Sequence, residues 1–163
     1  MSRAAAVCLA GLLALAGCAA PSGSPTSDVS VSVTNRADTT YEVRTAVVSD
    51  GFAALDVTYR NGTTRRVLAS RMSDVPSAAL VNAANVSVVG AEAARAERLA
   101  PGEGLATLYE DVPGNVSVLY VAWPPGADRI RTYGALSCAA GQHVEASVTL
   151  YPGNDDASVV CRG

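Results

Sequence analysis

Four cysteines and one histidine are the side chains of this sequence best suited to redox, metal or nucleophilic chemistry. The histidine, His143, lies between Cys138 and Cys161. A disulfide between these cysteines closes a loop that stabilises a fold by about 3 kcal/mol on the chain-entropy argument. A metal site with His143 is the rival interpretation, but the Cys138–His143 spacing matches no usual zinc pairing and no fourth ligand is evident. Free thiols are the third alternative. The sequence favours the disulfide and no metal.

Because one histidine suffices for a Ser-His-Asp triad, a hydrolase with an unrecognised site is the alternative function. The sequence has no G-x-S-x-G elbow, and the nearest stretch, Gly134–Cys138, does not match it. The acidic pairs Glu110-Asp111 and Asp155-Asp156 fall at strand ends or turns, where solvated carboxylates are ordinary. We therefore expect no catalytic residues, no cofactor and no enzyme activity.

Composition removes further classes of function. All 12 basic residues are arginine, so the lysine of a P-loop NTPase and the Schiff-base lysine of pyridoxal-phosphate enzymes are both missing. A formal net charge of −3 gives no basic patch for nucleic acid. The lack of lysine fits a GC-rich source, haloarchaeal or actinobacterial.

The first 18 residues resemble the signal peptide of a prokaryotic lipoprotein. Arg3 precedes the uncharged run 4–16, which is too short to span a bilayer, and Leu15-Ala16-Gly17-Cys18 is similar to a lipobox. The resemblance implies cleavage of residues 1–17, lipid on the Cys18 sulfur, and a protein anchored to the cell membrane facing outside the cytoplasm. An ordinary signal peptide cut near Ala20 is the alternative. Cys8 is discarded in either case.

Residues 18–27 are rich in Ser, Pro and Gly and are typical of a flexible tether. From Asp28 the pattern changes, since apolar and polar residues alternate in Val29–Thr34 and again in Val144–Leu150. About nine short strands separated by Gly, Pro and Asn turns predict an all-β, immunoglobulin-like β-sandwich over residues 28–163. In this setting disulfides persist, because the domain is exported.

Four local features refine that prediction. Asn61-Gly62 between two strand-like runs indicates a hairpin, because both residue types tolerate positive φ. Residues 76–84 predict one short helix that begins after a proline, with Asp74 as a possible cap. Residues 91–99 have helix propensity, but their position between strands favours a strand. The apolar run Val116–Trp123 is typical of a central strand.

Three sequons, at Asn61, Asn85 and Asn115, are candidate glycosylation sites in an exported protein. Tyr120, Trp123 and Tyr133 are aromatic residues that either line a ligand surface or, as we expect, pack in the core. The sequence thus predicts a small lipoprotein with a non-catalytic binding or structural role at the cell surface. Its expected partners are the membrane, through Cys18, and an envelope protein or glycan.

Overall fold

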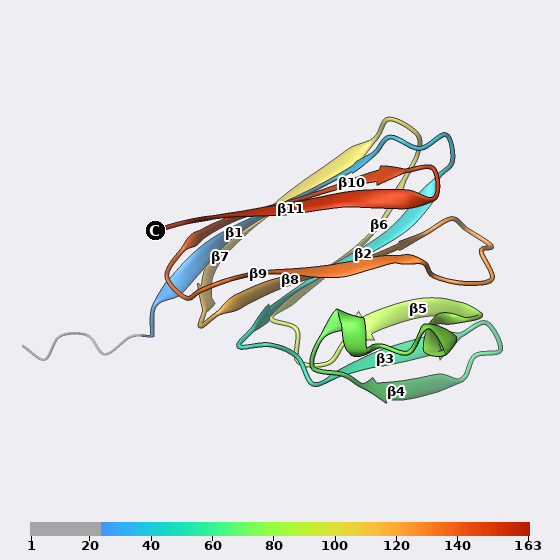
Figure 1. Ribbon diagram of the computed structural model, residues 1–163, viewed down its shortest axis with the longest axis horizontal. Helices are drawn as coiled ribbons and strands as arrows, with labels where there is room; N and C mark the ends of the chain where they lie inside the picture. The colour runs from blue at the N-terminus through green and yellow to red at the C-terminus, as the bar shows by residue number, and fades with distance from the viewer. Residues whose placement is uncertain (1–23) are drawn as a thin grey trace, which may run out of the picture.

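Eleven β-strands form nearly all the regular structure of residues 24–163, the part of the chain that the computed structural model describes (Figure 1). The predicted signal peptide 1–17, Cys18 and most of the predicted tether 18–27 lie outside it. The strands are β1 (Thr26–Asn35), β2 (Tyr41–Ser49), β3 (Ala54–Tyr59), β4 (Thr64–Leu68), β5 (Ala83–Val88), β6 (Ala93–Leu99), β7 (Gly104–Pro113), β8 (Val116–Trp123), β9 (Thr132–Cys138), β10 (His143–Tyr151) and β11 (Asn154–Arg162).

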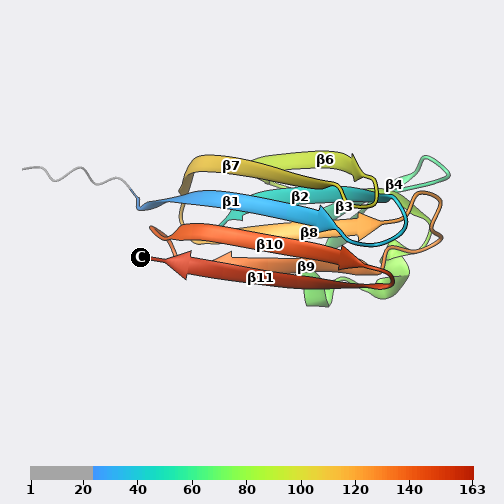
Figure 2. The same ribbon diagram turned by 90° about the horizontal axis from the view of Figure 1, so that it is seen from above.

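Two four-stranded sheets form the sandwich. Sheet A has the order β11-β10-β1-β7, seen from above in Figure 2, and sheet B has the order β6-β2-β8-β9. β1 pairs in parallel with β10 and antiparallel with β7. Alternate valines of β1, Val29, Val31 and Val33, are at most 1% exposed and face sheet B, so the period of two seen in the sequence separates core from solvent.

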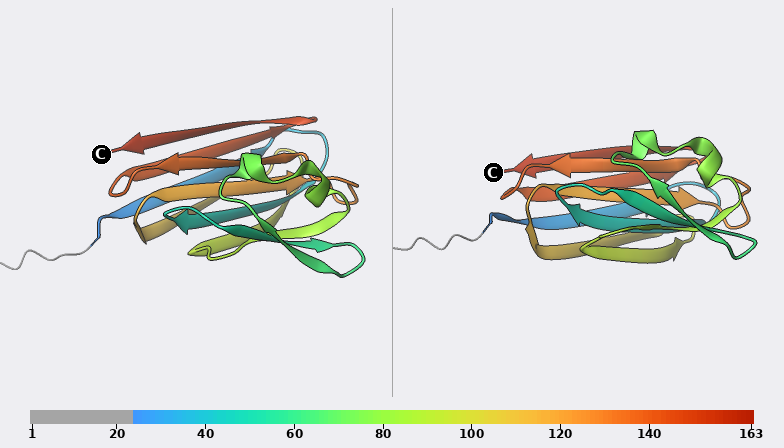
Figure 3. Two further views of the ribbon diagram at one scale, coloured as in Figure 1. Left: turned by 60° about the horizontal axis from the view of Figure 1, so that its bottom comes forward. Right: turned by 90° about the horizontal axis from the view of Figure 1, so that it is seen from below.

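A third sheet covers the other face of sheet B. Sheet C, of order β4-β3-β5, comes from residues between β2 and β6 and forms a separate layer, which lies below sheet B in Figure 1 and faces the viewer in Figure 3. β8 therefore has a core on both faces. Val118 packs between sheets A and B, whereas Leu119 packs between sheets B and C. This double burial explains the continuous apolar run of β8, as in other strands that are covered on both faces.

The prediction of an all-β sandwich is confirmed, with a strand over 93–99 and β8 near the centre of sheet B. The structure has eleven strands instead of about nine, because β3–β5 form a layer of their own. β1 begins at Thr26, inside the segment assigned to the tether. No helix within residues 24–163 is long and apolar enough to cross a membrane.

The predicted short helix at 76–84 is wrong in type and length. In its place the structure has a 3-10 turn at Ser77–Leu80, and a shorter 3-10 turn precedes it at Met72–Asp74. Asp74 lies in the earlier turn and caps nothing. The turn ends because Val81 pairs with Arg129 and Asn82 takes a positive φ of 55°, after which β5 begins. Tertiary pairing thus overrides a local helical preference.

The hairpin at Asn61-Gly62 is confirmed, but its turn differs from the expected one. Only Gly62 has a positive φ, 83°. Its N–H donates to the Tyr59 carbonyl at 2.9 Å, and the Tyr59 N–H donates to Thr63. This is a three-residue loop closed by a left-handed glycine, the next most common class after two-residue hairpin loops.

Candidate binding face at the free end of the sandwich

The strand registers divide the turns between two ends of the molecule (Figure 1). At one end, which we call the terminal end because both chain ends of the described residues lie near it, Thr26 at the start of β1 pairs with Pro113, and Arg162 near the end of β11 pairs with His143. At the other, the free end, β1 finishes at Asn35 opposite Leu150, and β8 finishes at Trp123 opposite Glu42. The turns between β1 and β2, β6 and β7, β8 and β9, and β10 and β11 therefore gather at the free end.

A hollow of about 350 Å³ opens among three of these turns. Its charged residues are Asp38 from the β1–β2 turn and Asp128, Arg129 and Arg131 from the β8–β9 turn, and all four are exposed. The remaining lining residues are Thr39, Tyr41, Ala122, Pro124, Ala127, Thr132, Pro152 and Gly153. We call this group of residues the free-end hollow.

Asn35 fixes the β1–β2 side of the hollow. It is fully buried, and its Nδ2 donates to the carbonyls of Thr39 at 2.8 Å and Leu99 at 3.0 Å. Its Oδ1 accepts from the Ala37 N–H at 3.0 Å. Because a buried amide with all these partners holds the chain in one geometry, Asp38 projects from a braced turn.

Sheet C and its connections brace the β8–β9 side. The Asn82 N–H donates to the Asp128 carbonyl at 2.6 Å, and the Ile130 N–H donates to the Leu80 carbonyl at 3.1 Å. Arg60, in the β3–β4 hairpin, donates through Nη2 to the Ala127 carbonyl. The third layer thus positions Asp128 and Arg129 without covering them.

The four charges of the hollow remain available to a partner. Within residues 24–163, no ion pair involves Asp38, Asp128, Arg129 or Arg131. Exposed opposite charges on fixed turns can complement a partner surface and set the orientation of docking. In the same hollow Tyr41 is only 4% exposed, so it offers little ring face for a sugar to stack on.

The predicted cysteine pair lies at the terminal end. Cys138 and Cys161 form a disulfide with a Cα–Cα distance of 5.8 Å, which joins β9 of sheet B to β11 of sheet A. Neither sulfur is then free to ligate a metal with His143. Residues 24–163 also contain no cluster of three His, Cys, Asp or Glu side chains placed to hold a metal.

His143 is exposed on the outside of β10, and its Nε2 lies 3.6 Å from Glu145 Oε1. In the part of the chain that the structure describes, no serine hydroxyl is hydrogen-bonded to His143. The structure therefore provides no contact that would favour the hydrolase alternative.

The three sequons have different surroundings. Asn61 is exposed at the hairpin tip, where its Oδ1 accepts from the Thr63 N–H at 3.0 Å and hydroxyl at 2.7 Å. Asn85 is half-buried and accepts from Arg44 Nε at 3.0 Å. Asn115 lies at the terminal end and donates from Nδ2 to Asp50 at 3.0 Å. The Asn61 side chain thus bonds within its own hairpin, whereas Asn85 and Asn115 bond to side chains of other segments.

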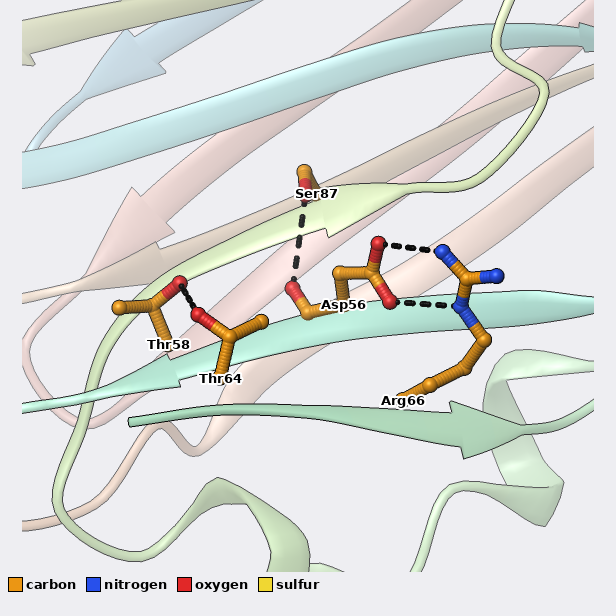
Figure 4. A network of polar contacts seen from close by, with 5 residues as sticks. All are labelled: Asp56, Thr58, Thr64, Arg66 and Ser87. Atoms are coloured by element: carbon orange, nitrogen blue, oxygen red, sulfur yellow. Dashed lines mark hydrogen bonds and ion pairs between the residues drawn. The ribbon is translucent and has the colours of Figure 1, made fainter. Parts of the chain in front are cut away.

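A second polar group lies on the outer face of sheet C (Figure 4). Arg66 binds both oxygens of Asp56, at 2.8 and 2.9 Å, and this hydrogen bonding lowers the pKa of the Asp56 carboxyl. Thr58 and Thr64 share a hydrogen bond of 3.0 Å beside them. Since these side chains satisfy one another across neighbouring strands, the group is a surface ladder and not a ligand site.

A family model for the halobacterial Ig domain protein matches residues 1–163. The chain belongs to this family. The immunoglobulin-like character of the sandwich is thereby confirmed, together with a prokaryotic, haloarchaeal origin of the family. No curated protein matches the chain.

Two solved structures are similar to it in part. The type VI secretion lipoprotein TssJ1 of Pseudomonas aeruginosa is 10% identical with a TM-score of 0.44, over 85% of this chain and 98% of that one. A Gram-negative toxin is 10% identical with a TM-score of 0.34, over 83% of this chain and 23% of that one. Likenesses of this extent carry no implication for the function of this chain.

Sequence reasoning did not identify the free-end hollow. Asp38, Asp128, Arg129 and Arg131 are scattered through turns, and only the pairing of the strands brings them together. The expected core packing of Tyr120, Trp123 and Tyr133 is confirmed, but the three residues divide between two cores. Tyr120 faces the sandwich core, whereas Trp123 and Tyr133 belong to the core beside sheet C. The alternation of β8 alone would have separated Tyr120 from Trp123, because residues three apart point to opposite faces.

Proposed function

We propose that this protein is a lipid-anchored, non-catalytic binding module of the cell surface. Lipid on Cys18 would hold it on the outside of the cell membrane, and the free-end hollow would bind another envelope protein. The observation that carries the proposal is the polarity of the sandwich. β1 begins at the terminal end, whereas the four exposed charges of the hollow, which form no ion pair within residues 24–163, lie at the opposite end.

The charges of the hollow favour a protein partner over a glycan. Asp38 and Asp128 can bind cations of a partner, and Arg129 and Arg131 can bind carboxylates, with guanidinium groups suited to two parallel hydrogen bonds. A glycan site commonly needs an apolar ring face, which buried Tyr41 does not supply. The hollow therefore suits a polar protein surface with charges of both signs.

The anchor is tested by replacing Cys18 with serine in cells. We expect the wild-type protein in the membrane fraction, with an intact mass raised by acyl groups, and the Cys18→Ser protein without either property. Cys8→Ser is the matched control, because it changes a cysteine of the predicted signal peptide and leaves Cys18 in place. A Cys18→Ser protein that stays on the membrane with an unchanged mass would contradict the anchor.

The partner is tested with a photo-crosslinking amino acid at Arg129, in the hollow, or at Ser147, exposed on the outer face of sheet A. We expect a discrete crosslinked product from position 129 in intact cells and none from position 147. Replacing Arg131 with glutamate in the Arg129 probe should reduce the product by tenfold or more. Equal crosslinking from both positions, or none from position 129, would reject the free end as the binding face.

Glycosylation remains part of this proposal. Of the three sequons we propose Asn61 as the acceptor, because its hairpin tip is exposed and Asn85 is engaged with Arg44. A glycan on Asn61 would stand beside the hollow, at the free end, without blocking the terminal end.

A further inference from the structure

An apolar cavity of about 160 Å³ lies between sheets B and C, away from the free-end hollow. Leu55, Met72 and Leu119 are buried residues that line it. Ala94 and Ala96 of β6 form its exposed side, and their small side chains leave it open to solvent. An engineered apolar cavity of about 150 Å³ in another protein binds benzene, so a void of this size can hold a small apolar group.

Two cations line this cavity, Arg44 and Arg95, and of these only Arg44 has no ion pair within residues 24–163. Arg44 on β2 is half-buried, and its guanidinium carbon lies 5.6 Å from the centre of the Trp123 ring. The Nε of Arg44 donates to Asn85 Oδ1 at 3.0 Å, and its Nη1 donates to the Val43 carbonyl at 3.3 Å. Both acceptors are neutral. No carboxylate within residues 24–163 forms an ion pair with Arg44.

The neighbouring arginines show that this arrangement is particular to Arg44. On the adjacent strand β6, Arg98 lies opposite Glu42 and pairs with it at 2.8 Å, and Arg95 pairs with Glu97 at 2.8 Å. Arg44 is less exposed than either, yet it has neutral partners only. A guanidinium has five N–H donors, and two of those on Arg44 have partners in the structure. The remaining donors can bind an anion at the mouth of the cavity.

We propose that this cavity binds a small carboxylic acid with an apolar body, such as a medium-chain fatty acid. The carboxylate accepts hydrogen bonds from Arg44 at the rim, and the hydrocarbon lies against Leu55, Met72 and Leu119. Charge complementarity at the rim and apolar area inside are the two parts of a typical small-ligand site. The site lies apart from the free-end hollow, so it stands independently of the proposed protein partner.

Trp123 provides a direct measurement, because it is the only tryptophan of the chain and lies beneath the Arg44 guanidinium. The full-length protein is titrated with sodium octanoate, and with 1-octanol as a neutral ligand of equal chain length. We expect octanoate to change the Trp123 emission with a Kd below about 1 mM, and octanol to bind at least tenfold more weakly.

Two variants test the two parts of the site. Arg44→Gln removes the charge and should weaken octanoate binding at least tenfold, while octanol binding stays the same. Ala96→Leu fills the open side of the cavity and should weaken both ligands. Arg65→Gln is the matched control, because it removes an equal charge from an exposed position on β4 outside the cavity.

Amide NMR shifts provide a second measurement that does not depend on Trp123. They should change for residues of β2, β5 and β6 and not for the free-end turns. Equal affinity for octanoate and octanol, an unchanged octanoate affinity in folded Arg44→Gln, or no binding at millimolar octanoate would each overturn the proposal. If Arg44→Gln does not fold, the comparison of octanoate with octanol and the Ala96→Leu variant still decide it.

Discussion

At the scale of single residues, Tyr120 connects the two sheets of the sandwich through a polar contact in an apolar core. It is 6% exposed, and its hydroxyl donates to Asp155 Oδ2 at 2.5 Å, from sheet B to sheet A. Its ring lies over Gly134, where a Cβ would come within 2.6 Å of the tyrosine hydroxyl. Gly134 is therefore required by the ring, and any larger residue there would displace Tyr120.

Replacing Tyr120 with phenylalanine should lower the free energy of unfolding by about 2 kcal/mol, because it removes a partly buried hydrogen bond to a charged acceptor. Urea denaturation monitors this change. Tyr59→Phe is the control, since its hydroxyl donates to the neutral Ala79 carbonyl at 3.1 Å and its loss should cost about 1 kcal/mol. Equal losses in the two variants would show that the Asp155 charge adds nothing.

The same residue predicts a dependence on alkaline pH. Burial, and then the hydrogen bond and charge of Asp155, raise the pKa of Tyr120 above its ordinary value of 10.0. Above that pH the tyrosine releases its proton in the unfolded chain but keeps it in the folded protein. The contribution of Tyr120 to the free energy of unfolding is therefore fully present below about pH 10 and decreases as the pH rises further. Between pH 9 and 11 the wild-type protein should lose more stability than Tyr120→Phe. Parallel pH profiles would contradict this assignment.

At the scale of elements, β11 depends on the disulfide. β11 is an edge strand paired only with β10, and Cys161 near its end is bonded to Cys138 at the end of β9. The bond closes one side of the sandwich at the terminal end and holds an edge that would otherwise fray. Its loop spans a sequence separation of 23 residues, for which the chain-entropy model gives about 3 kcal/mol.

The free energy of unfolding of a double Cys138→Ala/Cys161→Ala variant should therefore be about 3 kcal/mol lower than that of the wild type. Its β11 amides should also exchange hydrogen faster than those of β1. Arg162→Gln is the control for disturbing the same strand end. It breaks an exposed ion pair with Glu145 and should change stability by about 0.5 kcal/mol or less. A denaturation midpoint that a reducing agent leaves unchanged would rule out this role of the disulfide.

The strands that could be predicted from sequence are those whose own residue pattern reflects their burial, on one face as in β1 and β10 or on both faces as in β8. β1 and β10 alternate because one face meets the core and the other meets water. The prediction of a helix at 76–84 was wrong because Val81 pairs with Arg129, which lies far along the chain, and no local signal reveals that pairing. The free-end hollow and the Arg44 cavity were missed for the same reason, since each is assembled from turns or strands distant in sequence.

At the scale of the whole molecule, sheet B is shared by two cores. Val118 and Leu119 are neighbours on β8, and both are at most 1% exposed, but Val118 points toward sheet A and Leu119 toward sheet C. Sheet C comes from one continuous stretch of chain between β2 and β6. We therefore expect sheet C to separate from sheet B while the sandwich of sheets A and B remains intact.

Leu119→Ala and Val118→Ala should distinguish these two layers. Leu119→Ala leaves a void against sheet C and should lower the stability of that layer by about 2–5 kcal/mol, so the amides of β3 exchange hydrogen faster while those of β1 stay protected. Val118→Ala weakens the sandwich that supports all three sheets, so β1 and β3 should lose protection together. Hydrogen exchange of both variants measures this directly. Equal acceleration of β1 and β3 in Leu119→Ala would mean that the three layers unfold as one unit, and that the braces of the free-end hollow are as stable as the sandwich itself.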